Sequence, residues 1–94
     1  MIKADIVSKI SSDTRIQKPI VETVVEAFFD SIIDSVAEGN KVTFAGFGSF
    51  EPVERKGRQA RNPQNDEPVM IPTYIAPRFK PGKKFKSAVY KVVK

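Results

Sequence analysis

Two chemically versatile residue types are missing from this chain of 94 residues, which has no cysteine and no histidine. Without cysteine there is no disulfide framework, no thiolate nucleophile and no soft-metal site, and without histidine the commonest general base is missing. The acidic residues are scattered, mostly along the outer face of one predicted helix, so no convergent catalytic pair is expected. The sequence therefore predicts a protein that is not an enzyme and that uses no cofactor, metal or small-molecule substrate.

Long apolar runs are also absent. The first five residues include a lysine and an aspartate where a secretory signal would need apolar side chains, and no later run approaches the length of a membrane span. A chain of this length falls below the usual size of one domain, so it cannot hold two independent cores. We expect one domain, residues 1–94, in the cytoplasm and without a membrane partner.

Positive charge is concentrated in the C-terminal part of the chain. Residues 1–54 carry five basic and nine acidic side chains, a net charge of −4, whereas residues 55–94 carry eleven basic and two acidic ones, a net charge of +9. Such a basic segment favours a polyanionic partner, either nucleic acid or an anionic membrane surface. On charge alone, a solvated lysine-rich face is an equally good interpretation.

Two amphipathic helices are predicted in the N-terminal part. The first, residues 2–10, has isoleucines at a spacing of four and is expected to end before Ser11. The second begins near Pro19 and ends at Gly39, with apolar residues repeating at three and four along one face. A chain this small has little surface to cover that stripe, so we expect burial in a dimer interface, although burial within one chain stays open.

From residue 41 apolar and polar side chains alternate, which is typical of a strand, and the alternation resumes after Gly46-Phe47-Gly48. Two strands separated by this glycine-containing segment predict a hairpin. Residues 53–75 hold four basic side chains but little apolar surface, so they are expected to form a projecting two-stranded ribbon with its turn at residues 63–66. A disordered linker is the alternative. A last helix with a lysine-rich face is expected after Pro81-Gly82.

The predicted ribbon has residue types that suit the minor groove of DNA. Arginine is long, permanently charged and planar, so it can enter a narrow electronegative groove and contact phosphates and base edges. A proline near the turn, Pro63, offers a rigid apolar wedge that could enter between base pairs and kink the duplex. Taken alone, Pro63 is more simply a turn residue.

Four short motifs occur in the order and spacing found in one known family, and with the predicted helices they cover essentially the whole chain. These motifs are Gly46-Phe47-Gly48-Ser49-Phe50-Glu51, Arg61-Asn62-Pro63-Gln64, Ile71-Pro72 and Phe79-Lys80-Pro81-Gly82-Lys83. The chain resembles the HU/IHF family of bacterial histone-like DNA-binding proteins, and the HU branch most closely.

The resemblance implies an α+β fold in an intertwined homodimer. It implies a helical dimerisation base in residues 1–39, a three-stranded antiparallel sheet extended into a β-arm in residues 41–80, and a short C-terminal helix in residues 82–93. The implied function is architectural: the protein would bind duplex DNA in the nucleoid with little sequence specificity, bend it and compact it. An IHF-like factor with a sequence preference is the closer alternative, and a basic module that binds RNA or acidic partners is a more distant one.

Site residues follow from the same resemblance. Pro63 would be the intercalating tip, with its neighbours in the minor groove, and lysines of the body would hold flanking phosphates. The expected DNA-binding residues are Lys3, Arg55, Arg58, Arg61, Asn62, Pro63, Gln64, Lys80, Lys83 and Lys86. The expected residues of the dimer core are Phe28, Phe29, Ile32, Phe44, Phe47, Phe50 and Phe79.

Four positions depart from the family pattern. Asn65-Asp66 replaces the usual threonine and glycine after the arm motif; Asn65 can adopt the left-handed conformation, so we expect a turn to survive here with a different shape. Asp66 would place a negative charge near the DNA. Val53 stands where a basic residue is frequent, and Pro68 is expected to interrupt the returning strand of the ribbon.

Overall fold

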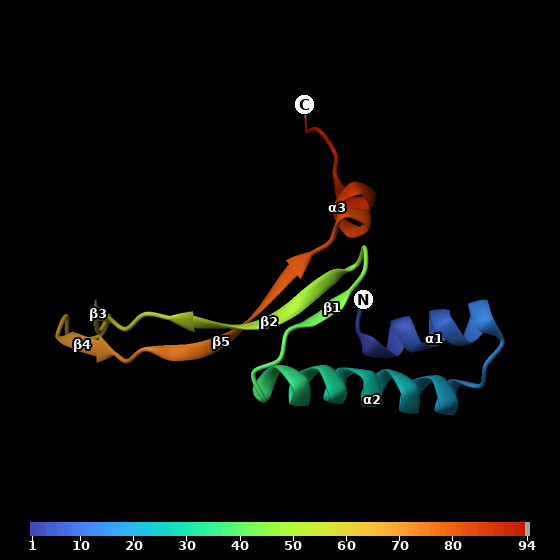
Figure 1. Ribbon diagram of the computed structural model, residues 1–94, viewed down its shortest axis with the longest axis horizontal. Coiled ribbons are helices and arrows are strands. Elements are labelled where there is room, and N and C mark those ends of the chain that lie inside the picture. The colour runs from blue at the N-terminus through green and yellow to red at the C-terminus, as the bar shows by residue number, and fades with distance from the viewer. Residues whose placement is uncertain (94) are drawn as a thin grey trace. The chain divides into compact units, whose positions relative to one another are not determined.

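The computed structural model describes residues 1–93 and contains two compact units, residues 1–34 and the rest of the described chain. Figure 1 shows three helices and five strands in the order α1 (Lys3–Thr14), α2 (Lys18–Ala37), β1 (Val42–Phe44), β2 (Gly48–Arg55), β3 (Arg58–Arg61), β4 (Pro68–Ile71), β5 (Tyr74–Pro81) and α3 (Lys83–Val89). The combination of helices and antiparallel strands confirms the α+β class.

The N-terminal unit is a helical hairpin in which α1 runs alongside α2 (Figure 1). The prediction that the first helix ends before Ser11 is wrong by one turn, because α1 continues to Thr14. Arg15 then adopts a left-handed conformation, with φ of 62°, and its N–H donates to the Ser11 carbonyl at 2.9 Å. Serine and threonine near this end therefore belong to the last helical turn and not to a preceding loop.

The second helix has the predicted extent. Pro19 is its second residue, where a missing N–H costs no helical hydrogen bond. After Ala37 the chain leaves the helix through Gly39, whose φ is 98° and whose N–H donates to the Val36 carbonyl, while Asn40 N–H donates to Ser35. This pair of bonds is the Schellman arrangement, which favours glycine at the left-handed position.

The predicted hairpin forms two strands of a three-stranded antiparallel sheet, with strand order β1-β2-β5. Its turn contains Gly46 and Phe47, with Gly48 as the first residue of β2, and the Phe47 carbonyl accepts a hydrogen bond from Gly82 N–H at 2.7 Å. A Cβ at Gly82 would lie 2.6 Å from the Gly46 carbonyl oxygen, so the two glycine motifs meet each other. Their first role is to bring the hairpin turn against the start of α3.

The last helix is shorter than the expected residues 82–93. It ends at Val89, and Tyr90 already has a ψ of 126°, outside the helical region. Phe85 is the residue of α3 that packs on the sheet, with its ring centroid 5.4 Å from that of Phe47 and 5.9 Å from that of Phe79. A helix of seven residues is therefore enough to make this contact.

The two-stranded ribbon is confirmed. Strands β3 and β4 pair antiparallel, with Arg58 opposite Ile71 and Arg61 opposite Pro68, and continue the direction of β2 and β5 away from the sheet (Figure 1). We call residues 58–71 the arm. Pro68 does not interrupt the returning strand as expected, because it is the first residue of β4, a position where a strand tolerates proline.

Candidate nucleic-acid interface

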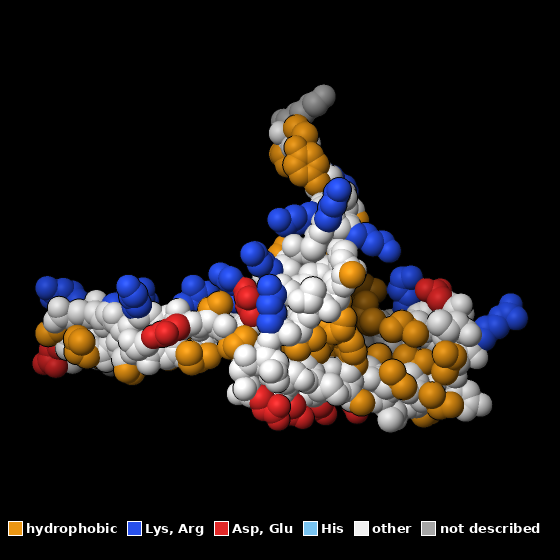
Figure 2. Space-filling model, viewed as in Figure 1, with side chains coloured by type: hydrophobic (Ala, Val, Ile, Leu, Met, Phe, Trp, Pro, Cys, Tyr) orange, Lys and Arg blue, Asp and Glu red, His pale blue; other side chains and the backbone are white. Residues whose placement is uncertain are grey.

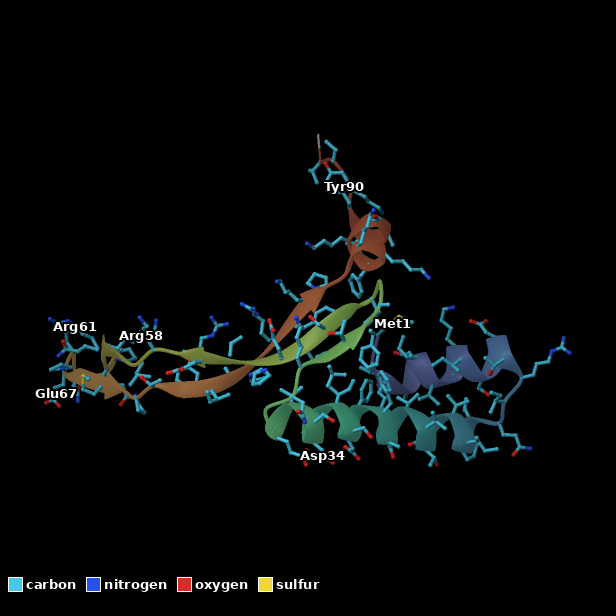
Figure 3. All side chains as sticks on the ribbon, in the orientation of Figure 1. Met1, Asp34, Arg58, Arg61, Glu67 and Tyr90 are labelled. Atoms are coloured by element: carbon cyan, nitrogen blue, oxygen red, sulfur yellow. The ribbon has the colours of Figure 1, made fainter. Side chains whose placement is uncertain are left out.

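The two strands of the arm have different chemistry. β3 reads Arg-Gln-Ala-Arg and β4 reads Pro-Val-Met-Ile, so the cations lie on one strand and the apolar side chains on the other. Figure 2 shows Lys and Arg side chains along one long edge of the arm and hydrophobic side chains along the other, and Figure 3 shows Arg58 and Arg61 on the β3 side. The arm therefore presents a basic edge.

Arg58 and Arg61 project from opposite faces of the arm. Successive side chains alternate across a strand, and these two residues are three positions apart. Both are exposed. A ribbon that enters a groove has a wall on each side, so cations on both faces can reach the phosphates of both strands of a duplex.

The tip of the arm is a closed turn of residues 62–67. Asn62 N–H donates to the Glu67 carbonyl at 2.9 Å, Asp66 N–H donates to the Asn62 carbonyl at 2.8 Å, and Gln64 N–H donates to Asn62 Oδ1 at 2.9 Å. Asn62 is thus engaged in shaping the turn, whereas Pro63 and Gln64 are exposed at its end. Pro63 is therefore an exposed, rigid apolar group in this turn.

The turn is present, as expected, and the structure shows which of its residues is left-handed. The left-handed residue is Asp66, with φ of 57°, while the Asn65 side chain accepts a hydrogen bond from Glu67 N–H at 3.1 Å. Aspartate and asparagine both tolerate this conformation, so the sequence could not separate the two positions.

Asp66 also makes contact with one of the expected DNA-binding residues. Arg61 Nη1 donates to the Asp66 carbonyl at 3.1 Å and lies 3.4 Å from its carboxylate Oδ2. Both side chains are exposed. The predicted negative charge at the tip is therefore directed at Arg61 and holds its guanidinium against the turn.

A charged face of the three-stranded sheet was not predicted. Cross-strand partners share a face, and the register places Thr43, Ser49 and Lys80 in one row. The next row contains Lys41, Glu51 and Arg78. Arg78 Nε donates a hydrogen bond to Glu51 Oε1 at 3.0 Å, and Lys41 Nζ lies 4.0 Å from Glu51 Oε2. The alternation of side chains in the sequence indicates which residues of one strand share a face. Only the strand register shows which residues of the three strands are neighbours.

Glu51 is the acidic centre of this face. Its hydrogen bond with Arg78 lowers the pKa of its carboxyl below the ordinary value, against a smaller opposing effect of burial, and the positive charges of Lys41 and Lys80 lower it further. Three cations thus surround one carboxylate, which leaves an excess of positive charge on this face of the sheet.

The other expected cations lie at several places. Arg55 ends β2 opposite Tyr74, Lys80 lies on β5, and Lys83 and Lys86 are three residues apart in α3. Lys3 belongs to the N-terminal unit, where its Nζ lies 2.7 Å from Glu26 Oε1, and this hydrogen bond raises the pKa of Lys3. Lys3 therefore remains charged, but it has an acidic partner within the chain.

The expected dimer-core residues fall in two groups. Phe44, Phe47, Phe50 and Phe79 form a ring cluster in the sheet unit with centroid separations from 4.8 to 6.4 Å, which Phe85, missing from the prediction, completes. The ring centroids of Phe28 and Phe29 lie 6.1 Å apart on α2. Ile32 lies on the same helix. Phe28, Phe29 and Phe47 are each more than two-fifths exposed in a single chain.

Two other kinds of site find no support in residues 1–93. Acidic side chains do not gather there in any group of three or more that could hold a metal ion. Within the same residues, no helix combines the length and apolar character needed to cross a membrane.

Comparison with known proteins gives a consistent result. The family model described as bacterial DNA-binding protein matches residues 1–90. DNA-binding protein HU-1 of Halalkalibacterium halodurans is 43% identical over 89 residues, which cover 95% of this chain and 99% of that protein, and HU of Geobacillus stearothermophilus is 40% identical with the same coverage. The cocrystal structure of Anabaena HU with DNA matches with a TM-score of 0.91 and 39% identity, covering 95% of this chain and 97% of that one.

Proposed function

This chain belongs to the HU/IHF family of bacterial DNA-binding proteins, and from that premise we propose that its arm enters the minor groove of duplex DNA and bends the duplex. The protein is a histone-like, architectural DNA-binding protein of the nucleoid, and it is not an enzyme. The observation that carries the proposal is the projecting arm, which presents cations on both faces of β3 and an exposed proline at its tip.

The proposed contacts divide into three groups. Arg55, Arg58 and Arg61 neutralise phosphates along the groove, because arginine combines permanent charge with a planar fork of donors. Pro63 enters between base pairs, flanked by Asn62 and Gln64, and the bend brings flanking DNA to the body. The body contacts are made by Lys3, Lys80, Lys83 and Lys86.

Binding by this route depends on charge more than on sequence. Phosphate contacts release counterions and carry no sequence information, so we expect little discrimination among duplexes. Any preference for particular sequences then comes from differences in how easily the DNA bends, as in an IHF-like factor. We also propose that residues 1–94 act as one DNA-binding domain in a homodimer located in the cytoplasm, since the exposed phenylalanines need a partner surface.

Removal of one arm cation tests the phosphate contacts. Arg58→Gln should weaken binding to a random duplex and make the affinity less dependent on salt, by about 0.9 in the logarithmic slope for each phosphate that is no longer neutralised. Fluorescence anisotropy at several salt concentrations measures both quantities.

The matched control is Lys9→Gln, which removes one exposed charge from α1, where the side chain pairs with Asp13 at 3.0 Å. It should leave the affinity close to that of the parent. Equal affinities for Arg58→Gln and the parent would instead favour a basic module whose partner does not engage the arm.

A further inference from the structure

A polar hollow lies on the charged face of the sheet, away from the arm. It has a volume of about 220 Å³ and opens to solvent, and its polar side chains are Lys41, Thr43, Ser49 and Lys80. Phe44, Pro81 and glycines 46, 48 and 82 complete the lining. All of these residues belong to the sheet unit.

The register explains why two hydroxyls and an ammonium group meet there. Thr43 pairs with Ser49, and Ser49 pairs with Lys80, so the three side chains stand next to one another across three strands and on one face. Ser49 is 8% exposed and is the one buried polar residue in the described part of the chain. Ser49 thus lines the hollow as a buried hydroxyl between a threonine and a lysine, and a hydroxyl can donate a hydrogen bond.

Glycine keeps the hollow compact. At Gly48, where φ is 154°, a Cβ would lie 2.6 Å from the Lys80 carbonyl oxygen, and at Gly82 it would lie 2.6 Å from the Gly46 carbonyl oxygen. The close approach of these segments brings the Lys80 backbone against the hairpin turn. The backbone segments that carry Ser49 and Lys80 are therefore closely packed against each other.

The charge around the hollow favours an anion. Glu51 is the acidic side chain beside the hollow, and its carboxylate accepts a hydrogen bond from Arg78 Nε at 3.0 Å. Lys41 lies 4.0 Å from the same carboxylate, while Lys80 flanks the hydroxyl row. Two lysines and an arginine against one glutamate leave a net positive charge for an incoming group.

We propose that this hollow is a seat for one phosphodiester group of duplex DNA, with the Thr43 and Ser49 hydroxyls donating hydrogen bonds to a non-bridging oxygen and Lys41 and Lys80 supplying charge. The proposal rests on the function proposed above and adds a fixed contact on the body. Lysine binds phosphate as a point charge, and the neutral hydroxyls add direction to that attraction. An open hollow suits a group that is carried on a polymer.

The test separates the hydroxyls from the charges. The double variant Thr43→Val, Ser49→Ala keeps every charge, so it should bind a random duplex roughly tenfold more weakly with an unchanged salt slope, as expected when hydrogen bonds to a charged group are removed. Lys41→Gln should reduce the slope by about 0.9 for each phosphate that is no longer neutralised. Ser12→Ala, an exposed serine of α1, is the control and should bind as the parent does.

A second measurement tests anion binding in the hollow in the absence of DNA. Titration of the parent protein with inorganic phosphate, followed by NMR, should shift the amide resonances of Thr43 and Ser49, and the double variant should lose these shifts. Circular dichroism checks folding, and Thr43→Val alone, which conserves side-chain shape at an exposed position, replaces the double variant if that does not fold.

Parental duplex affinity in the folded hydroxyl variant would overturn the proposal. So would phosphate-induced shifts with no effect of the variant on duplex binding, because the hollow would then take a free anion. A parent protein that fails to bind any duplex contradicts the proposed function instead, and the phosphate titration still reports on the hollow in that case.

Discussion

At the scale of single residues, the tip of the arm combines a wedge with a counter-charge. Pro63 is exposed within a turn whose hydrogen bonds are made by its neighbours, so its ring is held without contributing a donor of its own. Asp66 holds Arg61 through its carbonyl and carboxylate oxygens. The two features predict separable effects on bending and on affinity.

Pro63→Ala should reduce bending more than binding, because it removes the wedge and leaves every charge in place. Energy transfer between dyes at the two duplex ends measures the bend, and anisotropy on the same duplex measures the affinity. A variant that bends DNA as sharply as the parent would rule out intercalation by Pro63.

Asp66→Asn should increase affinity several-fold and steepen the salt slope, by about 0.9 for each additional phosphate that Arg61 neutralises. Asparagine tolerates the left-handed conformation that Asp66 adopts, so the turn is preserved.

The control is Glu67→Gln, which changes the net charge equally at the adjacent residue. If both variants tighten binding by the same factor, the effect is one of overall charge, and the pairing of Asp66 with Arg61 does not restrain the arginine.

At the scale of elements, the sequence predicted the type of almost every element, but not all of their ends. Proline and glycine marked the ends of α2 correctly, because each has a specific backbone requirement there. The end of α1 was missed because serine and threonine are frequent both in loops and in last helical turns. The ribbon was predicted from its lack of apolar surface, and the structure confirms it.

The candidate interface shows a similar division. The arm residues could be named from a contiguous motif, whereas the row of Thr43, Ser49 and Lys80 joins segments of the chain that only the strand register brings together. The pairing of Arg61 with Asp66 depends on which turn residue takes positive φ, and composition does not decide this. Local signals were therefore sufficient to predict the ribbon, whereas they did not show which side chains share a face of the three-stranded sheet.

The ion pair between Glu51 on β2 and Arg78 on β5 predicts a pH-dependent contribution to stability. The pKa of Glu51 is lowered in the folded state, chiefly by Arg78, so its charged form stabilises the fold above the ordinary value of 4.5 and this contribution is lost as pH falls through the lowered value. Glu51→Gln should therefore lower Tm at neutral pH, and the difference from the parent should shrink in acid.

Thermal unfolding followed by circular dichroism across this pH range checks the expectation. Glu54→Gln, on the same strand but on the opposite face of the sheet, is the control and should have a smaller effect at neutral pH. A Glu51→Gln difference that is constant down to acid pH would show that the ion pair does not stabilise the sheet.

At the scale of the whole molecule, the single chain buries too little apolar surface to stand alone. Among the hydrophobic residues of the described chain, only Val7 and Val21 are buried, each 4% exposed, while Phe28, Phe29 and Phe79 remain at least 39% exposed. Small domains are marginal even with well-buried cores, so a second copy is the simplest cover for these rings. A dimer also supplies a second arm, which doubles the phosphate contacts on one duplex.

The measurement that tests the central claim most directly is a mobility-shift titration on intact, nicked and defined-sequence duplexes at two salt concentrations, with the protein mass determined by light scattering. A homodimeric, architectural DNA-binding protein should have the mass of two chains, bind all three duplexes with little sequence preference, favour the nicked one and weaken steeply as salt rises. A monomer, or a protein indifferent to DNA and to salt, would contradict the account.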